Sequence, residues 1–304
     1  MLPTRNGSFR LFQFSGIEVF LHWSWFVVGA IEVNSRSAEY SSFTWNVLEY
    51  LSLFLIVLLH EFGHSLACRQ VGGKASQIYL WPLGGVAFVS PPPRPGATLW
   101  SIAAGPLVNV ALMPILLAGC WAMASAGWEQ SHPDAFNWIT SVLYINGALL
   151  AFNILPVYPL DGGQILRSLL WFFLGRSRSL LVATAIGFLG GLGLLAMAVK
   201  LNSMWMAIMS GFLLWHCWKA FRQAQVLSRI DSAPRRQGLH CPACQASPPI
   251  GEFWVCGNCH RYFDTFGTGA VCSGCSASFS QTMCLYCAQA SPMANWMGGT
   301  GEAT

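Results

Sequence analysis

The stretch LFLIVLLHEFGH, residues 53–64, decides the fold of this chain. Its first part, residues 53–59, is entirely apolar, and two histidines and a glutamate follow directly. A long apolar run is typical of a membrane-spanning helix, which needs roughly 20 residues. Ionisable side chains at membrane depth are unfavourable unless they are paired or bind a metal, so we expect the functional site at this junction.

His60 and His64 are four residues apart, so a helix places both on one face, where they can bind one zinc ion. Glu61 lies beside them and can accept a proton from a water molecule that the zinc activates. The alternative interpretation is that both histidines lie at the membrane interface and form hydrogen bonds only with water.

The composition supports a membrane protein. The 304 residues are 54% hydrophobic and only 9% charged, whereas an ordinary soluble domain carries about 25% charged residues. This balance excludes a typical cytosolic enzyme and a disordered scaffold. We predict a polytopic α-helical membrane protein with about six transmembrane helices. The predicted spans lie near residues 17–33, 47–68, 99–126, 139–155, 180–199 and 203–221, and a shorter apolar segment covers 164–175.

The positive charges predict the orientation in the membrane. If the N-terminus is cytoplasmic and the predicted spans alternate, all Lys and Arg residues except Arg36 and Lys200 lie on the cytoplasmic side. We therefore expect both termini in the cytoplasm. The compact design, with few additional domains, favours the inner (plasma) membrane of a bacterium.

A short β-hairpin is expected between the second and third spans, at the cytoplasmic membrane face. Gly84 and Gly85 form a turn signal between two short runs of strand-forming residues. These residues are Ile78, Leu80, Val86, Phe88 and Val89.

A third zinc ligand is needed, because a catalytic zinc usually has three protein ligands and a water molecule. Asp161 is the candidate, within NILPVYPLDGG at residues 153–163. The predicted orientation brings the fourth span back to the cytoplasmic side, where His60 and His64 also lie. The alternative is an ordinary turn aspartate before two glycines.

Three asparagines lie within the predicted spans. Asn153 is a candidate catalytic residue, because its amide could stabilise the oxyanion or orient the substrate. Asn109 is a weaker candidate for such a role. Asn146 is interpreted mainly as a hydrogen-bonding contact between helices.

Several motifs together carry a family resemblance. They are GIEVFLHWSW at 16–25, HEFGH at 60–64, PLGGVA at 82–87, GPLVN at 105–109 and NILPVYPLDGG at 153–163. With these motifs, the chain resembles the site-2 protease family of intramembrane zinc metalloproteases. The resemblance implies a helical membrane core that holds zinc below the membrane surface. It implies His60, His64 and Asp161 as zinc ligands, and Glu61 as the general base.

The activity implied is that of a zinc metalloendopeptidase in regulated intramembrane proteolysis. Substrates would be single-span membrane proteins within the lipid bilayer. A substrate helix hides its carbonyl groups in hydrogen bonds, so it must unwind before it is cleaved. The resemblance suggests that the hairpin at 78–89 holds the unwound segment by strand addition.

Two other functional classes remain open. A catalytically silent membrane scaffold would recruit partners through the C-terminal tail, although Glu61, which such a scaffold would not need, is present. A zinc transporter would be expected to carry metal ligands at several depths, whereas those found here cluster at one level.

The tail contains a second kind of metal motif. Eight of the 11 cysteines lie in four C-x-x-C pairs, and two such pairs can close one tetrahedral zinc site. The sequence therefore predicts a β-rich double zinc ribbon with two structural zinc ions, besides the catalytic one. Three pairings are possible, and we favour the sequential one. It joins Cys241, Cys244, Cys256 and Cys259 at one zinc, and Cys272, Cys275, Cys284 and Cys287 at the other.

Disulfides are the alternative for these cysteines, but a cytoplasmic tail lies in a reducing compartment. Nucleic acid is not an expected partner, because Arg261 is the only Lys or Arg in residues 241–304. Aromatic residues in excess of a small core suggest a protein partner instead. They are Phe253, Trp254, Tyr262, Phe263 and Phe266.

The expected domain organisation follows from these changes in composition. Residues 1–222 would form the intramembrane metalloprotease domain, and the polar segment 223–240 a linker. Residues 241–290 would form the double zinc ribbon, and 291–304 a flexible C-terminus.

Overall fold

The computed structural model describes residues 7–36, 38–81 and 84–296, and it divides into two compact units. The first unit comprises Met1–Phe173 and Val182–Trp218, and the second comprises Leu174–Leu181 and Lys219–Thr304. Each unit is described by itself.

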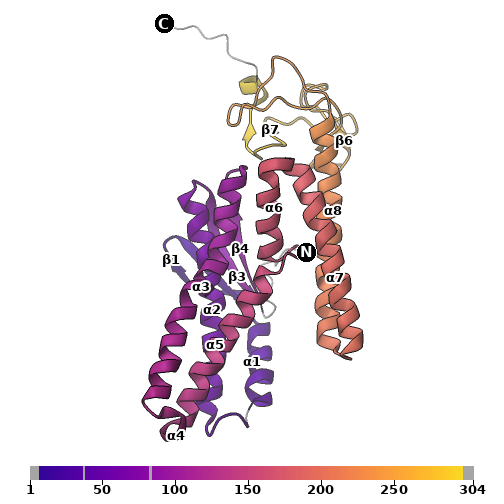
Figure 1. Ribbon diagram of the computed structural model, residues 1–304. Coiled ribbons are helices and arrows are strands. Elements are labelled where there is room, and N and C mark those ends of the chain that lie inside the picture. The colour runs from indigo at the N-terminus through magenta and orange to yellow at the C-terminus, as the bar shows by residue number, and fades with distance from the viewer. Residues whose placement is uncertain (1–6, 37, 82–83, 297–304) are drawn as a thin grey trace. The chain divides into compact units, whose positions relative to one another are not determined.

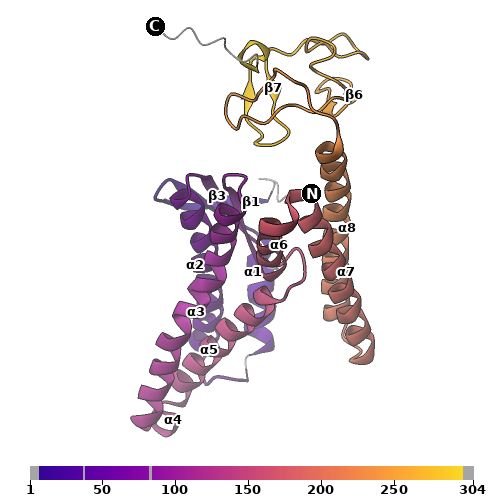
Figure 2. The same cartoon turned by 45° about the horizontal axis from the view of Figure 1, so that its top comes forward.

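The helices account for most of the chain (Figure 1). They are α1 (Ser24–Ser35), α2 (Phe43–Gln70), α3 (Pro95–Ser125), α4 (Trp128–Ser131), α5 (Pro133–Ile154), α6 (Asp161–Leu174), α7 (Arg176–Lys200) and α8 (Met204–Ser232). Helices α2, α3 and α5 pack against one another, and Figures 1 and 2 show them side by side.

Among the described residues, four helices are long and apolar enough to cross a membrane, namely α2, α3, α5 and α7. They coincide with four of the predicted spans, and the protein is therefore a polytopic helical membrane protein. Helix α8 matches the predicted last span in position, but Trp, His and Lys residues lower its hydropathy. That α8 crosses the membrane, as the last of the six predicted spans, stays a prediction.

The first predicted span, 17–33, is wrong as a continuous helix. Ile17–His22 form a β-strand, and α1, which follows it, has only 12 residues. The apolar run in this segment has a length typical of a membrane-spanning helix. Its alternate residues Ile17, Val19 and Leu21 instead enter the core of a sheet.

The predicted hairpin is confirmed, and it belongs to a larger sheet, but Gly84 and Gly85 pair with β3 as part of a strand and do not form the turn that the sequence predicted. Strands β1 (Ser8–Phe14), β2 (Ile17–His22), β3 (Lys74–Trp81) and β4 (Gly84–Ser90) lie in the order β1-β2-β3-β4. The β2–β3 pair is parallel, and the other two pairs are antiparallel. The turn at residues 82–83 lies outside the described residues.

Burial of apolar side chains attaches this sheet to α2. Ile78 and Leu80 on β3 are fully buried and pack with Val57 and Leu58 of α2. Strand β4 is an edge of the sheet and also contacts α2. The sheet therefore brings a strand edge to the helix that carries His60.

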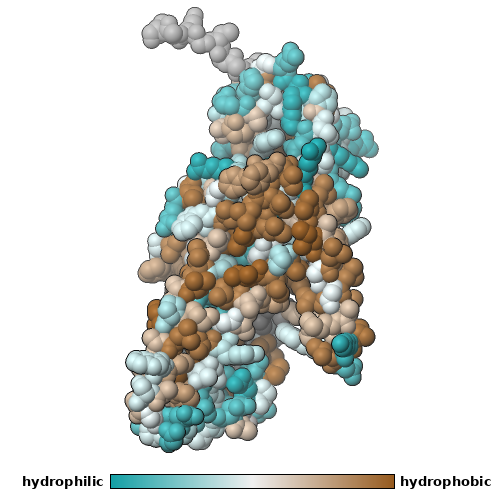
Figure 3. All heavy atoms as spheres, in the orientation of Figure 1, coloured by the Kyte–Doolittle hydropathy of each residue, from teal (hydrophilic) through white to brown (hydrophobic). Residues whose placement is uncertain are grey.

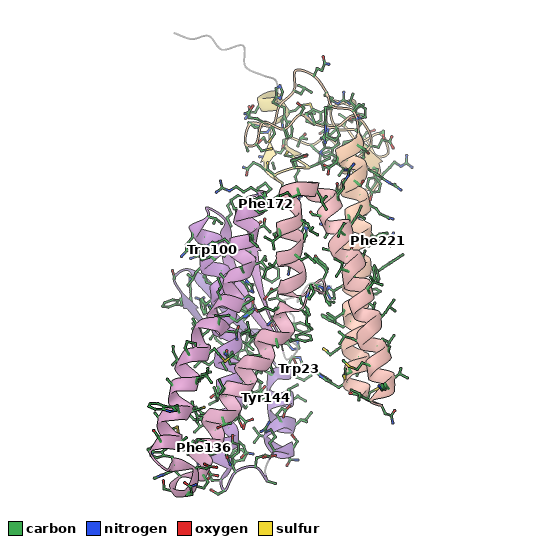
Figure 4. All side chains as sticks on the ribbon, in the orientation of Figure 1. Trp23, Trp100, Phe136, Tyr144, Phe172 and Phe221 are labelled. Carbon is green, nitrogen blue, oxygen red and sulfur yellow. The ribbon has the colours of Figure 1, made fainter. Side chains whose placement is uncertain are left out.

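The outer faces of the long helices carry large apolar side chains, as expected for surfaces in lipid. Trp121 on α3 is 74% exposed and Leu189 on α7 is 72% exposed. Tyr144 on α5, 76% exposed, is labelled in Figure 4. In Figure 3, hydrophobic residues gather over the helices on the face in view.

The second unit contains two small antiparallel hairpins, β5–β6 and β7–β8. Their strands are Trp254–Val255, Tyr262–Phe263, Thr282–Met283 and Ala290–Ser291. Helix α8 continues through Ser232, so the first ten residues of the predicted linker 223–240 are helical. Trp296, placed by the sequence in a flexible C-terminus, is 1% exposed in the core of this unit. Residues 297–304 lie outside the described residues.

Candidate metal centre

Three elements of the first unit meet around His60 and His64. The two histidines lie one helical turn apart on α2, and both are buried. Helix α3 packs along this face of α2, and Asp161 is the first residue of α6. The structure therefore brings together the three residues that the sequence singled out as ligands.

The three potential ligand atoms converge on one point. Nε2 of His60 lies 3.1 Å from Nε2 of His64. Oδ2 of Asp161 lies 3.0 Å from the first nitrogen and 3.3 Å from the second. A tetrahedral zinc with bonds of ~2.0–2.2 Å holds its ligand atoms about 3.3 Å apart. The donor set and its spacing therefore fit zinc.

Both imidazoles present the nitrogen that a metal requires. Nδ1 of His60 lies 2.7 Å from Oδ1 of Asn109, and Nδ1 of His64 lies 2.9 Å from the backbone oxygen of Ser101. Oxygens of this kind only accept, so each Nδ1 carries the hydrogen. The lone pair of each neutral ring is then on Nε2, which faces Asp161.

Close backbone packing forms the wall of the site. A Cβ atom at Gly105 of α3 would lie 2.3 Å from Nε2 of His64 and 2.8 Å from Nε2 of His60. Any side chain at this position would therefore occupy the space between the ligand atoms. The glycine of the GPLVN motif is thus explained by the metal centre.

Asp161 is positioned by a tight turn between α5 and α6. A Cβ at Gly162 would lie 2.1 Å from the backbone oxygen of Ile154, and one at Gly163 would lie 2.4 Å from the nitrogen of Tyr158. The chain folds back on itself too closely for larger residues. The two glycines after Asp161 therefore allow the turn that brings its carboxylate to α2.

Glu61 faces the edge strand β4. Its Oε2 accepts a hydrogen bond from the backbone N–H of Ala87 at 2.9 Å. A Cβ at Gly85 would lie 2.2 Å from Cγ of Glu61, so β4 approaches this side chain as closely as glycine permits. The carboxylate of Glu61 therefore lies between α2 and β4, the edge strand of the sheet.

The asparagines differ in their relation to the site. Asn153 lies near the end of α5, is half-buried, and makes no side-chain hydrogen bond to any described residue. Its catalytic role stays a prediction. Asn109 contacts His60 directly, through Oδ1 at 2.7 Å from Nδ1. In the sequence, Asn109 is marked by its place in an apolar span and at the end of the GPLVN motif.

Comparisons with known proteins agree with this geometry. A model of peptidase family M50 matches residues 49–131 and 117–197, which include His60, His64 and Asp161. The solved structure of the site-2 protease from Methanocaldococcus jannaschii is similar, with a TM-score of 0.50 and 29% identity. The similarity covers 71% of this chain and 95% of that one. The chain belongs to peptidase family M50, the site-2 protease family of zinc metalloproteases.

Two curated relatives show the extent of the similarity. This M50 chain is 34% identical over 182 residues to a zinc metalloprotease of Methanocaldococcus jannaschii, covering 60% of the chain and 51% of the relative. It is 28% identical over 270 residues to a Synechocystis protein named as a zinc metalloprotease, covering 82% and 69%. The chain therefore spans about half the length of the archaeal relative.

The tail of this M50 chain holds two four-cysteine clusters, but their pairing differs from the expected one. Four ligand atoms converge in each cluster. The outer cluster joins Cys241, Cys244, Cys284 and Cys287, and the inner cluster joins Cys256, Cys259, Cys272 and Cys275. The sequential pairing is therefore wrong, and the pairing is nested.

Packing between distant residues explains the nested pairing. Trp296 packs with Cys241 and Cys284, which draws the first and last pairs together. The ring of Phe263 stacks on Phe279 at 5.7 Å, which holds the two middle pairs together. The spacing of the pairs along the sequence carries no information about such contacts.

Each C-x-x-C pair has the backbone of a metal-binding knuckle. In every pair, the N–H of the residue after the second cysteine donates to the carbonyl of the first. That residue has a positive φ in all four, at Gln245, His260, Ser276 and Ala288. Sulfur–sulfur distances of 3.6 to 3.7 Å fit tetrahedral zinc, with Zn–S bonds of about 2.3 Å.

Backbone amides also favour the thiolate form that binds a metal. The N–H groups of Cys259 and Asn258 point at Sγ of Cys256, at 3.5 and 3.4 Å. These donors stabilise the negative charge and lower the pKa of Cys256 to about 6. The backbone around Cys256 therefore suits a thiolate that binds a metal.

Most of the tail aromatics form a core rather than a surface. Trp254 and Phe263 are buried, and Phe253 and Phe266 pack against them. Tyr262 is 57% exposed. The expectation that all five exceed the needs of the core is therefore wrong, and a protein partner of the tail is supported by fewer residues.

The metal site predicts a strong effect of one added methyl group. Gly105→Ala should lower zinc affinity at the site by at least about 10-fold, because the new Cβ overlaps the ligand nitrogens. Gly119→Ala on the same helix is the control, since its Cβ would lie 3.7 Å from Ile139. Zinc analysis after dialysis against a chelator measures the difference. Equal zinc retention in both variants would contradict this account of the wall.

The nested pairing is tested by two double variants in the intact chain. Cys241→Ser with Cys287→Ser damages only the outer cluster, so the inner cluster should keep its metal. Cys241→Ser with Cys256→Ser damages both clusters, so the tail should bind no metal tightly. Cadmium NMR, which distinguishes sulfur ligands from nitrogen and oxygen ligands, shows how many cysteine clusters still bind metal. The sequential pairing predicts the opposite result for the two variants.

Proposed function

We propose that this chain is an intramembrane zinc endopeptidase that cleaves the transmembrane segments of single-span membrane proteins. The strongest support is the convergence of two imidazole nitrogens and one carboxylate oxygen within 3.3 Å of one another. Glu61 lies beside them on the same apolar helix. The two curated relatives described above are named as zinc metalloproteases.

The depth of the site supports cleavage within the membrane. The residues from His60 to Gln70 form about 15 Å of helix at a rise of ~1.5 Å per residue. His60 therefore lies well inside α2, whose apolar composition is that of a membrane span. A segment of a soluble protein would have to enter the membrane to reach this depth, whereas a membrane-spanning substrate already lies within it.

The proposed chemistry divides between the metal and the protein. Zinc held by His60, His64 and Asp161 would supply a Lewis acid for water and for the scissile carbonyl. Glu61 takes the proton of the attacking water and returns it to the leaving amine. The N–H of Ala87 holds Oε2 of Glu61, which leaves Oε1 to exchange the proton.

The edge of β4 is the proposed binding surface for the unwound substrate. Ala87 directs its N–H away from β3 and toward Glu61, so this edge lies beside the reacting groups. Alternate residues of a strand point the same way, which gives Gly85 and Val89 outward backbone groups as well. An extended substrate segment can pair with these groups by strand addition.

The arrangement in the cell is also part of the proposal. The distribution of Lys and Arg supports cytoplasmic termini and a site that opens toward the cytoplasm. We place the chain in a bacterial inner membrane, with the protease domain within residues 1–222 and a zinc-binding tail from residue 241. The tail is proposed to bind a protein partner rather than nucleic acid.

Loss of Glu61 tests the proposed activity. Glu61→Gln keeps the size of the side chain but removes the proton acceptor, so turnover should fall by about 10²–10⁴-fold while zinc stays bound. Comparison of membrane proteomes from cells with wild type or variant measures the effect. Single-span proteins or their fragments should accumulate only in the variant.

Glu49→Gln is the matched control, because Glu49 is another buried glutamate of α2, paired with Arg36 instead. It should leave turnover unchanged. If no membrane protein accumulates in the Glu61 variant although its zinc content is normal, a scaffold function would replace the peptidase. Zinc uptake into liposomes that survives Glu61→Gln would favour a transporter.

A further inference from the structure

Two asparagines outside the ligand set form a buried chain that ends at His60. Asn109 on α3 and Asn146 on α5 both have 0% exposure. Nδ2 of Asn146 donates to the backbone oxygen of Asn109 at 3.0 Å, and Nδ2 of Asn109 donates to Oδ1 of Asn146 at 2.9 Å. Oδ1 of Asn109 lies 2.7 Å from Nδ1 of His60.

The direction of this chain follows from the group at its far end. The backbone carbonyl of Asn109 only accepts hydrogen bonds, so Asn146 must turn its NH₂ group toward it. Oδ1 of Asn146 then faces Asn109 and accepts from the NH₂ group there. The remaining amide atom of Asn109, Oδ1, therefore faces His60 and accepts from its Nδ1–H.

This direction determines which nitrogen of His60 can bind a metal. With the hydrogen on Nδ1, the lone pair lies on Nε2, next to Asp161. If the amide of Asn109 were reversed, its NH₂ group would face Nδ1 and favour the hydrogen on Nε2 instead. A protonated Nε2 cannot be a ligand.

We propose that Asn109 and Asn146 are positioning residues for the metal centre. Asn109 holds the imidazole of His60 with Nε2 ready to bind, and Asn146 prevents the Asn109 amide from reversing. The inference rests on the proposed function, because it takes His60 as a zinc ligand. Neither asparagine has to touch the substrate or the metal.

A purely structural role is the competing explanation, since the same hydrogen bonds also join α3 to α5. The two explanations differ in what a carboxylate at position 109 would do. Both oxygens of an aspartate accept, so its orientation toward His60 does not matter. An aspartate should therefore support metal binding without help from Asn146, although it would place an oxygen against Oδ1 of Asn146 and lower stability.

The experiment compares four variants of the full chain in detergent: Asn109→Leu, Asn109→Asp, Asn146→Leu and the Asn109→Asp/Asn146→Leu double variant. Cadmium is the probe, because its NMR signal separates this nitrogen and oxygen site from the cysteine clusters. Competition with a chelator gives the affinity. The nitrogen chemical shifts of His60 in the metal-free protein report which ring nitrogen carries the hydrogen.

We expect Asn109→Leu to weaken cadmium binding by about 10–100-fold and Asn146→Leu by about 10-fold, as for other partners of ligand histidines. Asn109→Asp should bind as tightly as wild type. Asn146→Leu should have no effect on affinity when aspartate occupies position 109. The control is Asn46→Leu, since Asn46 is a buried amide of α2 that bonds to Arg36 and is 4% exposed. It should lower thermal stability without changing affinity.

Equal weakening by Asn146→Leu in the wild-type chain and in the Asn109→Asp variant would overturn the inference, because the effect would then come from packing. Wild-type affinity in Asn109→Leu would overturn it as well. Failure of the proposed function gives a different result. In that case the wild-type chain would lack the cadmium NMR signal of a nitrogen and oxygen site, or His60→Ala would leave that signal in place. The assignment of His60 as a metal ligand would then be wrong, together with this inference.

Discussion

The constraint on which this structure depends is the convergence of three metal-binding atoms inside an apolar bundle. Polar groups buried this deeply are unfavourable unless they meet suitable partners. His60 and His64 come from one turn of α2, but Asp161 is far along the chain and must be brought to them. The break between α5 and α6 meets this need, because it directs the first residue of α6 at the histidines.

Glycines surround the metal centre because backbone segments approach it closely. Gly105, Gly85 and Gly162 lie where a Cβ would collide with a ligand, with Glu61 or with the turn itself. Backbone rather than side chains therefore encloses the metal centre on several sides. The same closeness lets the backbone N–H of Ala87 on β4 donate to Glu61, which connects the proposed general base to the strand that would receive a substrate.

The sequence predicts that His60, His64 and Asp161 meet, because the signals for this are local. A four-residue spacing determines the shared face of His60 and His64, and the distribution of Lys and Arg predicts that Asp161 lies on the same side of the membrane. The strand at 17–22 was not predictable in this way, since its parallel partner β3 lies far along the chain. The nested cysteine pairing depends on Trp296, whose contacts have no local signal. The orientation of Asn109 depends on Asn146 across another helix, so only the structure reveals it.

The central claim is that His60, His64 and Asp161 form a zinc site distinct from the cysteine clusters. The most direct measurement is anomalous X-ray scattering at the zinc absorption edge, from crystals of the full chain grown with zinc. The account predicts a peak between the two Nε2 atoms and Oδ2 of Asp161, besides one in each cysteine cluster. Peaks in the cysteine clusters alone would contradict it.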